Sequence, residues 1–539
     1  MSVRFLLGAS GSGKSRQIYN EIIQASIKEP EWNFYLIVPE QYTMEAQREL
    51  VTMHPAGGMM NIDAIGMNRL AYRVFDELGI STGQVLEDFG KSMLIKKILC
   101  EQQDTLQVYG SYYDKLGFVD EMKSMMSEIF QYNIKQDTID EIMEQIPEDS
   151  VVAGKMQDIR HIYEEFEAFA GERYIVAEQL VELLTRHVGQ SKLVCGSSLY
   201  FDGFTGFTPV QLELVEKLMT CADDLTFSFT LDDRDQKYEH IKDYELFYLT
   251  KTTIKKLTEA AAAGVEIEPP VVLPGTINYR LGENRELFFL ERNLFRSPYQ
   301  KWKQPLERIH LTATGDAQDE IVFVASTIRR LVREKGYRYK DIAIVAGDLE
   351  QASHIYERVM DEYEIPVFID ANACLKANPC AETIRSVLAV LADDFSYDSV
   401  FRFLKAGMTD LSFEDIELLE NYALKRGVRG YSRWNRAVSE NYEKTSPVNV
   451  EEIRQAFMKM FGDIRKVFAD KKAVTKDYVE ALYDFLLQIH MYEKLEDRKN
   501  ELYEENRINE GDAYGQIFEK TVRLFDKIAE LLGDTKMSV

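Results

Sequence analysis

The 539-residue sequence has little of what marks a secreted, membrane or metal-cluster protein. Its five cysteines include no C-x-x-C pair, so we expect neither a disulfide framework nor a thiolate metal cluster built by this chain alone. No apolar run approaches the roughly 18 residues of a membrane span, and the N-terminus lacks the pattern of a signal peptide. We therefore expect a cytoplasmic protein without a membrane partner.

Basic residues are in the minority, with 64 lysines and arginines against 90 aspartates and glutamates, so the formal net charge is −26. This balance excludes a surface that is basic throughout. A local basic track is still compatible with it, because phosphate contacts need only a few side chains. The length corresponds to about three or four domains at roughly 100–200 residues each.

The most specific motif stands at the N-terminus. Residues 3–7 predict a short buried strand, and the apolar spacing that follows the motif predicts a helix. Between them the sequence matches G-x-x-x-x-G-K-[ST], the loop in which backbone N–H groups and a helix N-terminus hold phosphates. Lys14 would reach the β- and γ-phosphates of ATP, and Ser15 would coordinate Mg²⁺. The predicted nucleotide-binding residues are Gly8, Ala9, Ser10, Gly11, Ser12, Gly13, Lys14 and Ser15.

A magnesium-binding acid is expected at the end of another buried strand. Asp202 follows Leu199, Tyr200 and Phe201 and is the candidate Walker B acid, sharing Mg²⁺ with Ser15. The next residue in hydrolysing helicases is usually Glu, but here it is Gly203, so we expect ATP to be bound and hydrolysed slowly. Asp-Gly is also a common turn pair, which leaves a purely structural role as the alternative.

The rest of the pattern alternates α/β and helical blocks. Residues 1–85 plus 190–280 predict a first α/β domain, with strands at 34–38, 59–65, 193–201 and 225–230, interrupted by a helical insertion over 86–189. Prolines and glycines over 267–285 mark a boundary. Residues 281–395 predict a second α/β domain, with a helix at 318–335 and strands at 309–311, 342–346 and 367–370. Residues 396–539 are helical; we expect the second α/β domain to be incomplete and this last block to be truncated.

Five segments resemble sequence blocks of the AddB family, the second subunit of the AddAB helicase–nuclease. They are Val38–Thr43 (VPEQYT), Phe201–Gln211 (FDGFTGFTPVQ), Phe289–Phe295 (FLERNLF), Gly336–Ala343 (GYRYKDIA) and Leu419–Tyr422 (LENY). The match runs from the phosphate-binding loop to at least Trp434. The resemblance implies an α/β protein with two RecA-like P-loop domains of superfamily 1 helicase type, each associated with a mainly helical insertion.

The resemblance also implies a function. It predicts a heterodimer with an AddA-type subunit that processes double-strand DNA breaks for recombinational repair, using ATP and Mg²⁺. The AddB-type subunit would be a poor motor that scans single-stranded DNA for a hotspot sequence. The family's nuclease domain holds an iron–sulfur cluster with four cysteines; neither these cysteines nor the nuclease motif G-x-I-D-R-x-D nor the motifs carrying an arginine finger occur here. The cluster is therefore expected only in the family's C-terminal region.

Positions that match the family's strand-reading residues are Gln41, Thr43, Arg69, Tyr72, Phe204 and Phe207. The amide and hydroxyl would hydrogen-bond base edges, the arginine would bind phosphate or guanine, and the aromatic rings would stack on bases. Each residue also suits an ordinary role: a helix cap for Thr43, a surface arginine for Arg69, and core packing for the aromatic rings.

A further DNA-binding candidate comes from charge alone. The window 423–436 contains no acid but holds Lys425, Arg426, Arg429, Arg433 and Arg436, interleaved with Tyr431 and Trp434. Such a reversal in a chain of charge −26 suits a duplex-binding or strand-guiding surface, with Arg429, Arg433 and Trp434 as DNA contacts. A solvated loop with glycine turns is the alternative.

Two other functions remain compatible with the motifs. One is a nucleotide-binding DNA scaffold without ATP turnover, which Gly203 favours. The other is a P-loop kinase or ATPase acting on a small molecule. The length of the chain and the AddB-like blocks argue against this second function.

Overall fold

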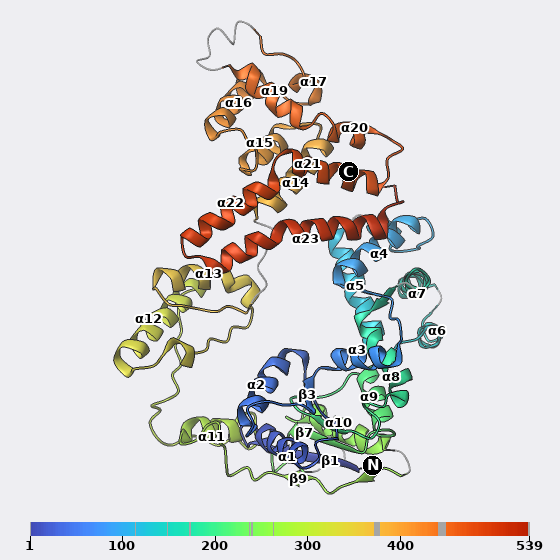
Figure 1. Cartoon of the computed structure of the whole chain (residues 1–539), viewed down its shortest axis with the longest axis vertical. Helices are drawn as coiled ribbons and strands as arrows, with labels where there is room; N and C mark the ends of the chain where they lie inside the picture. Colours follow the sequence, from blue (N-terminus) through green and yellow to red (C-terminus); the bar gives the residue numbers. More distant parts are fainter. Residues whose placement is uncertain are drawn as a thin grey trace. The chain divides into compact units, whose positions relative to one another are not determined.

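The computed structural model describes residues 2–536 apart from 114, 148, 172–173, 237, 239–240, 262–263, 371–377 and 440–448. The chain divides into two compact units, Met1–His310 and Leu311–Val539 (Figure 1). Among the described residues, no helix has both the length and the apolar character needed to cross a membrane.

The first unit is built on a parallel seven-stranded sheet in the order β3-β2-β6-β7-β1-β8, with β9 also pairing with β1. Its strands are β1 (Ser2–Gly8), β2 (Phe34–Ile37), β3 (Ile62–Ile65), β6 (Ser198–Phe201), β7 (Asp224–Thr230), β8 (Glu266–Ile267) and β9 (Val271–Val272). The strands predicted in residues 1–280 are thus confirmed, with shorter bounds for β3 and β6. Because all strands run the same way, the loops after them meet at one edge of the sheet.

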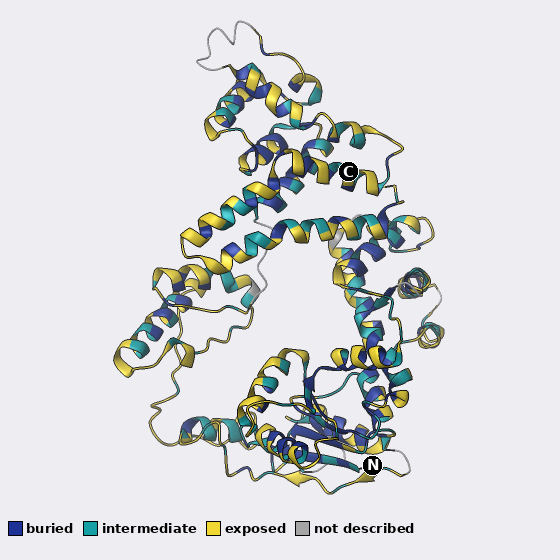
Figure 2. Ribbon diagram, in the orientation of Figure 1, coloured by how far each residue is buried: buried dark blue, intermediate teal, exposed yellow. Residues whose placement is uncertain are grey.

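Helices cover both faces of this sheet, and its strands are accordingly buried, except that β8 and β9 are exposed (Figure 2). Leu6 and Leu36 face a core shared with α1 (Lys14–Lys28) and α2 (Thr43–Met53). Phe5 and Ile37 face the opposite core. The helices on that side are α3 (Met67–Leu78), α8 (Ala177–His187), α9 (Pro209–Leu218) and α10 (Tyr248–Ala260). Apolar residues on both faces are what a parallel sheet between two helical layers requires.

A helical block lies between β3 and β6 in the sequence, as predicted. It contains α4 (Asp88–Glu101), α5 (Leu116–Gln131), α6 (Gln136–Glu144), α7 (Val151–Ala170) and the parallel pair β4 (Gln84–Leu86) and β5 (Tyr174–Val176). Lys91 of α4, only 2% exposed, joins this block to α8 through an ion pair to Glu178 at 2.9 Å, and it also pairs with Asp88 of its own helix at 3.0 Å. Since α8 packs into the core of the main sheet, the block is tied directly to the strands that carry the candidate site.

The described residues of the second unit form helices only. Ile321 and Ile328 of α12 (Ala317–Lys335) pack against Val359 of α13 (Leu349–Glu362) in a small core. A larger core joins the remaining helices. These are α14 (Pro379–Ala392), α15 (Tyr397–Lys405), α16 (Phe413–Arg426), α17 (Tyr431–Trp434), α19 (Val450–Met460), α20 (Ile464–Ala469), α21 (Thr475–Gln488), α22 (Met491–Glu504) and α23 (Ile508–Leu532). The helices predicted at 318–335 and after 396 are confirmed.

The three strands predicted at 309–311, 342–346 and 367–370 are not formed. Leu311 is fully exposed, Val345 is 96% exposed and Phe368 is 88% exposed. Ile342 and Ile369 still pack against the α12–α13 core, which explains the apolar pattern. A strand also needs a neighbour for its N–H and C=O groups, and among the described residues none of these segments has one.

Candidate functional site

The phosphate-binding loop lies between β1 and α1 at the carboxyl edge of the sheet. Gly11 and Gly13 adopt left-handed backbone angles, with φ of 77° and 94°. Residues with a side chain disfavour this conformation, so glycine suits both positions. The loop leads directly into α1, and no side chain caps the free N–H groups at the N-terminus of that helix. The loop lines a cavity of about 1310 Å³. Open N–H groups at a helix N-terminus beside a cavity suit a phosphate ligand.

Lys14 is held inside this loop. Its Nζ donates to Gly8 O at 2.9 Å and to Ala9 O at 3.0 Å. Burial lowers the pKa of Lys14 to about 8. The negative charge of Asp202 acts to raise this pKa, and the positive charge of Arg280 acts to lower it. Next to it, the hydroxyl of Ser12 is buried and has no hydrogen-bond partner among the described residues. A half-buried cation and a buried free hydroxyl are both stabilised by an anion entering the cavity.

Asp202 stands where the Walker B acid was predicted. It directly follows β6, is 5% exposed, lines the same cavity, and accepts a hydrogen bond from the hydroxyl of Ser228 on β7. Ser15 lines the cavity from the second residue of α1. One hydroxyl and one carboxylate are oxygen donors of the kind that Mg²⁺ accepts beside nucleotide phosphates, so these two residues fit the metal and would hold it.

Gly203, which follows Asp202, has a φ of 81°. A Cβ at this position would lie 3.4 Å from Pro39 Cδ and 3.7 Å from Tyr42 Cδ2. The backbone conformation therefore favours glycine here, and a glutamate would be strained whatever the space around it.

A strap formed by residues 274–281 crosses the phosphate-binding loop. The N–H of Tyr279 donates to Gly11 O at 2.8 Å, and the amide of Asn278 donates to Ser10 O at 2.8 Å. Arg280 Nη1 lies 3.3 Å from Ser10 Oγ and lines the cavity. The strap therefore adds a second cation to the phosphate side of the cavity.

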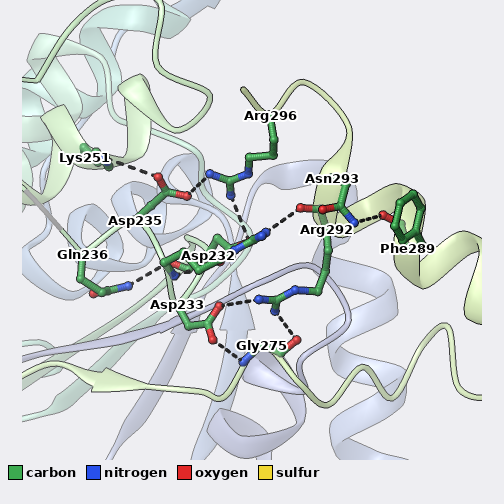
Figure 3. A network of polar contacts seen from close by, with 11 residues as sticks. Asp232, Asp233, Asp235, Gln236, Lys251, Gly275, Phe289, Arg292, Asn293 and Arg296 are labelled. Carbon is green, nitrogen blue, oxygen red and sulfur yellow. Dashed lines mark hydrogen bonds and ion pairs between the residues drawn. The ribbon is translucent and has the colours of Figure 1, made fainter. Parts of the chain in front are cut away.

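An ion-pair network anchors the strap to α11 (Arg285–Asn293), as Figure 3 shows. Arg292 lies 3.2 Å from Asp233 and donates to the carbonyl of Gly275. Asp233 in turn accepts the N–H of Gly275 at 3.2 Å. The start of the strap is thus bound to the loop that follows β7.

Asp232 is the centre of the same network. Its carboxylate lies 2.7 Å from Arg234 and 3.0 Å from Arg296, while Arg296 also pairs with Asp235 at 2.6 Å (Figure 3). Burial opposes ionisation of Asp232, but the hydrogen bonds from its neighbours, Arg234 first among them, hold its pKa well below the ordinary value. A permanently ionised carboxylate therefore keeps two arginines of this region in place.

A smaller cavity of about 470 Å³ adjoins the first. It is lined from the 3₁₀ helix η1 (Glu40–Tyr42), from the start of α3 and from the loop after β6. Residues Gly203, Phe204 and Thr205 line both cavities. Two of the predicted strand-reading residues, Gln41 and Phe204, are brought together here.

The other predicted residues of the first unit lie outside both cavities. The hydroxyl of Thr43 donates to Glu40 O at 2.9 Å, the local turn contact that was its alternative role. Arg69 and Tyr72 are exposed one turn apart on α3, next to the cavity residue Asn68. Phe207 packs against Phe201 and the aromatic side chains of β7, with ring centroids 6.0–6.3 Å apart. Phe207 is half-buried and part of its ring is used in these core contacts, so its base-stacking role stays a prediction.

The DNA-binding candidates of the second unit also differ in exposure. Arg429 and Arg433 are exposed. Trp434 is completely buried and donates from Nε1 to Phe395 O at 3.2 Å. The prediction that Trp434 stacks on DNA is wrong, because helix α17 turns its indole into the core.

Sequence reasoning missed the strap. Asn278 and Arg280 fall in a segment that the prolines and glycines marked as a domain boundary. The available signal was an arginine in a segment that follows β9, a short strand that pairs with β1. That signal becomes visible only when β9 is known to pair with β1.

Comparisons with known proteins point to one family. A family model described as ADDB, N-terminal matches residues 5–291. The B subunit of the ATP-dependent helicase/deoxyribonuclease of Lachnoclostridium phytofermentans is 38% identical over 545 residues, which cover 99% of this chain and 47% of the relative. Proteins of the same name from Caldanaerobacter subterraneus and Acetivibrio thermocellus are 32% and 31% identical over 100% of this chain and 47% and 48% of their own lengths. The chain thus spans about half the length of these curated relatives.

Proposed function

The chain belongs to the AddB family, and from this premise we propose that it is the ATP- and single-strand-binding part of the AddB-type subunit in a helicase–nuclease. The observation that carries the proposal is the pair of adjoining cavities in the first unit, which share Gly203, Phe204 and Thr205. One cavity offers cations and free N–H groups, and the other offers amide groups and an aromatic ring. A conformational change in this shared loop would therefore alter both cavities.

The larger cavity would hold Mg-ATP. The phosphate-binding loop would wrap the phosphates with its N–H groups, with Lys14 and Arg280 supplying positive charge. Ser15 and Asp202 would hold Mg²⁺, which neutralises the phosphates when bound. Arg280 comes from the same chain, so one phosphate-facing arginine is present even though the later arginine-finger motifs of the family are not.

The smaller cavity would hold part of a single strand. Gln41 and Asn68 carry both donors and acceptors for base edges, and Glu40 can accept from base amino groups. Phe204 offers the edge of a partly buried ring. Arg69 and Tyr72 on the exposed face of α3 would continue the contact beyond the cavity, the arginine on phosphate and the tyrosine by stacking. The polar lining suits base reading better than tight phosphate binding.

ATP turnover by this chain is proposed to be slow. Gly203 leaves the position after Asp202 without a carboxylate to orient water. The same feature favours the second candidate function, a DNA-binding scaffold whose nucleotide is not turned over. The two differ only in whether bound ATP is consumed.

The whole-protein role follows from the family. The relatives' name describes one subunit of an ATP-dependent helicase and deoxyribonuclease, so we propose an AddA-type partner and work on double-strand breaks during recombinational repair, with the single strand scanned for a hotspot sequence. We also propose that α12, α13 and the extended segments around them are part of a second RecA-like domain. Nuclease chemistry and its iron–sulfur cluster would reside in the half of the relatives that this chain does not match.

Equilibrium binding tests the proposal. A labelled single strand should bind the chain, and Gln41→Ala should weaken binding, whereas Gln145→Ala, an exposed glutamine on the helical block, should not. Labelled ATP should bind with Mg²⁺ and be lost in Lys14→Ala. Strand binding that ignores Gln41, or ATP binding that survives Lys14→Ala, would refute the assignment of the corresponding cavity.

A further inference from the structure

The end of helix α16 carries a concentrated positive charge. Residues 423–439 contain five basic residues and no acid, although the whole chain has a net charge of −26. Arg429, Arg433 and Arg436 are exposed, and among the described residues none of the three takes part in an ion pair. An exposed guanidinium whose charge is not paired with a carboxylate remains available to an external anion.

The backbone that presents these arginines is fixed by the core. Val428 and Trp434, between the arginines in sequence, are 5% and 0% exposed. Arg454 donates to Trp434 O at 2.6 Å, and the N–H of Gly430 donates to Phe395 O at 3.2 Å. Arg433 is itself oriented by a 2.6 Å hydrogen bond to Gly427 O at the end of α16. Such anchoring reduces the entropy lost on binding.

The same loop offers no surface on which bases could stack. The indole of Trp434 is buried, and the ring of Tyr431 is covered by Arg465, whose guanidinium carbon lies 3.6 Å from the ring centroid. Among residues 423–439, Leu424 on α16 is the one large apolar side chain that is exposed, at 60%, and it has no aromatic ring. Protein interfaces depend on apolar and aromatic anchors, whereas the backbone of a double helix needs only charge and hydrogen-bond donors.

We propose that this arginine face, defined by Arg429, Arg433 and Arg436 with Arg465 beside them, binds the phosphate backbone of duplex DNA. Its ligand differs from that of the first unit: the cavity around Gln41 takes an unpaired strand, and the arginine face takes the paired one. The inference rests on the proposed function in taking DNA as the substrate. It places a duplex contact in a helical region where the proposed function places none.

The test is the salt dependence of binding to a labelled blunt 30-base-pair duplex, followed by anisotropy from 50 to 200 mM salt. The variant Arg429→Ala/Arg436→Ala removes two side chains that make no hydrogen bond or ion pair in the described structure. The matched control is Arg507→Ala/Arg523→Ala, which removes two exposed arginines of the same unit that are already paired with Glu510 and Glu519. Both variants change the net charge equally.

Each lost phosphate contact should reduce the slope of log K against log salt by about 0.9, so the variant should lose about 1.8 and the control nothing. The affinity advantage of the wild type over the variant should then shrink about 12-fold across this salt range. The variant Arg429→Lys/Arg436→Lys keeps the positive charge and should retain the wild-type slope. It therefore distinguishes a loss of charge from a loss of folding as the cause of a changed slope.

Equal slopes for the variant and the control would overturn the proposal and favour an acidic protein partner for this face. A wild-type chain that binds single strands but no duplex would overturn it while leaving the single-strand assignment intact. A chain that binds duplex through Arg429 and Arg436 but no single strand would support the arginine face and refute the Gln41 cavity.

Discussion

The lowered pKa of Lys14 leads to a quantitative prediction about ATP binding. Burial in the phosphate-binding loop lowers this pKa to about 8, whereas a lysine paired with phosphate should return to its ordinary value near 10.4 or above. Lys14 is therefore protonated in the empty site below pH 8 and loses its proton as the pH rises through 8. ATP must then restore that proton on binding, so affinity should be highest below pH 8 and fall above it.

The size of the effect follows from these two pKa values. Affinity for Mg-ATP should fall about eightfold from pH 7.5 to 9.0, with uptake of about 0.9 proton at pH 9.0 and about 0.2 at pH 7.5. The ATP phosphates, with a second pKa near 6, are already ionised over this range. Isothermal titration calorimetry in two buffers of different ionisation enthalpy measures both quantities.

Lys14→Arg is the control for this experiment, because its guanidinium does not titrate below pH 12. The variant should bind more weakly but without dependence on pH. Wild-type binding that takes up no proton at pH 9.0 and keeps constant affinity would refute the reasoning, since Lys14 would then be either ordinary in pKa or remote from the phosphates.

Three further substitutions test individual residues. Trp434→Ala should cost about 3–5 kcal/mol in urea unfolding, because a fully buried indole is lost, whereas Tyr72→Ala on the surface of α3 should cost less than about 0.5 kcal/mol; equal costs would contradict the burial of Trp434. Gly203→Glu should lower stability by about 1–2 kcal/mol through its left-handed backbone, and because that strained backbone would not hold the new carboxylate against the water, DNA-stimulated ATP turnover should stay unchanged; a tenfold rise in turnover would show that the carboxylate does reach the water. Arg280→Ala should weaken Mg-ATP binding by about 10–100-fold, the loss expected for one charged hydrogen bond, without changing the melting temperature, and unaltered affinity would remove Arg280 from the phosphate site.

Features that depend on short stretches of sequence were predictable. The phosphate-binding loop, its strand and its helix are adjacent in the chain, so one motif defines the cradle. Asp202 could be placed because a run of large apolar residues marks the end of a buried strand. The helices of the last 140 or so residues follow from their apolar period, reinforced by caps such as Ser412, which accepts from Asp415 N at 3.1 Å at the start of α16.

Features that depend on distant partners were not predictable. Residues 342–346 are apolar enough for a buried strand. An apolar pattern, however, shows only that a segment packs against a core, and it does not show whether a neighbouring strand is there to pair with it. The aromatic and basic residues around Trp434 alternate in sequence, yet in the fold the aromatic rings turn inward and the arginines outward. Arg280 acquires its role only because β9 pairs with β1 and the Asp232 network fixes the strap.

The central claim is that the nucleotide and the single strand occupy adjoining cavities joined by Gly203–Thr205. Anisotropy of a labelled single strand, measured with and without saturating Mg-ATP, tests it most directly in the wild type and in Lys14→Ala. We expect Mg-ATP to change strand affinity several-fold, within the usual 5–150-fold range of coupling between sites, and Lys14→Ala to bind the strand but no longer respond to Mg-ATP. Strand affinity that is the same with and without Mg-ATP, under conditions where ATP is shown to be bound, would contradict the claim.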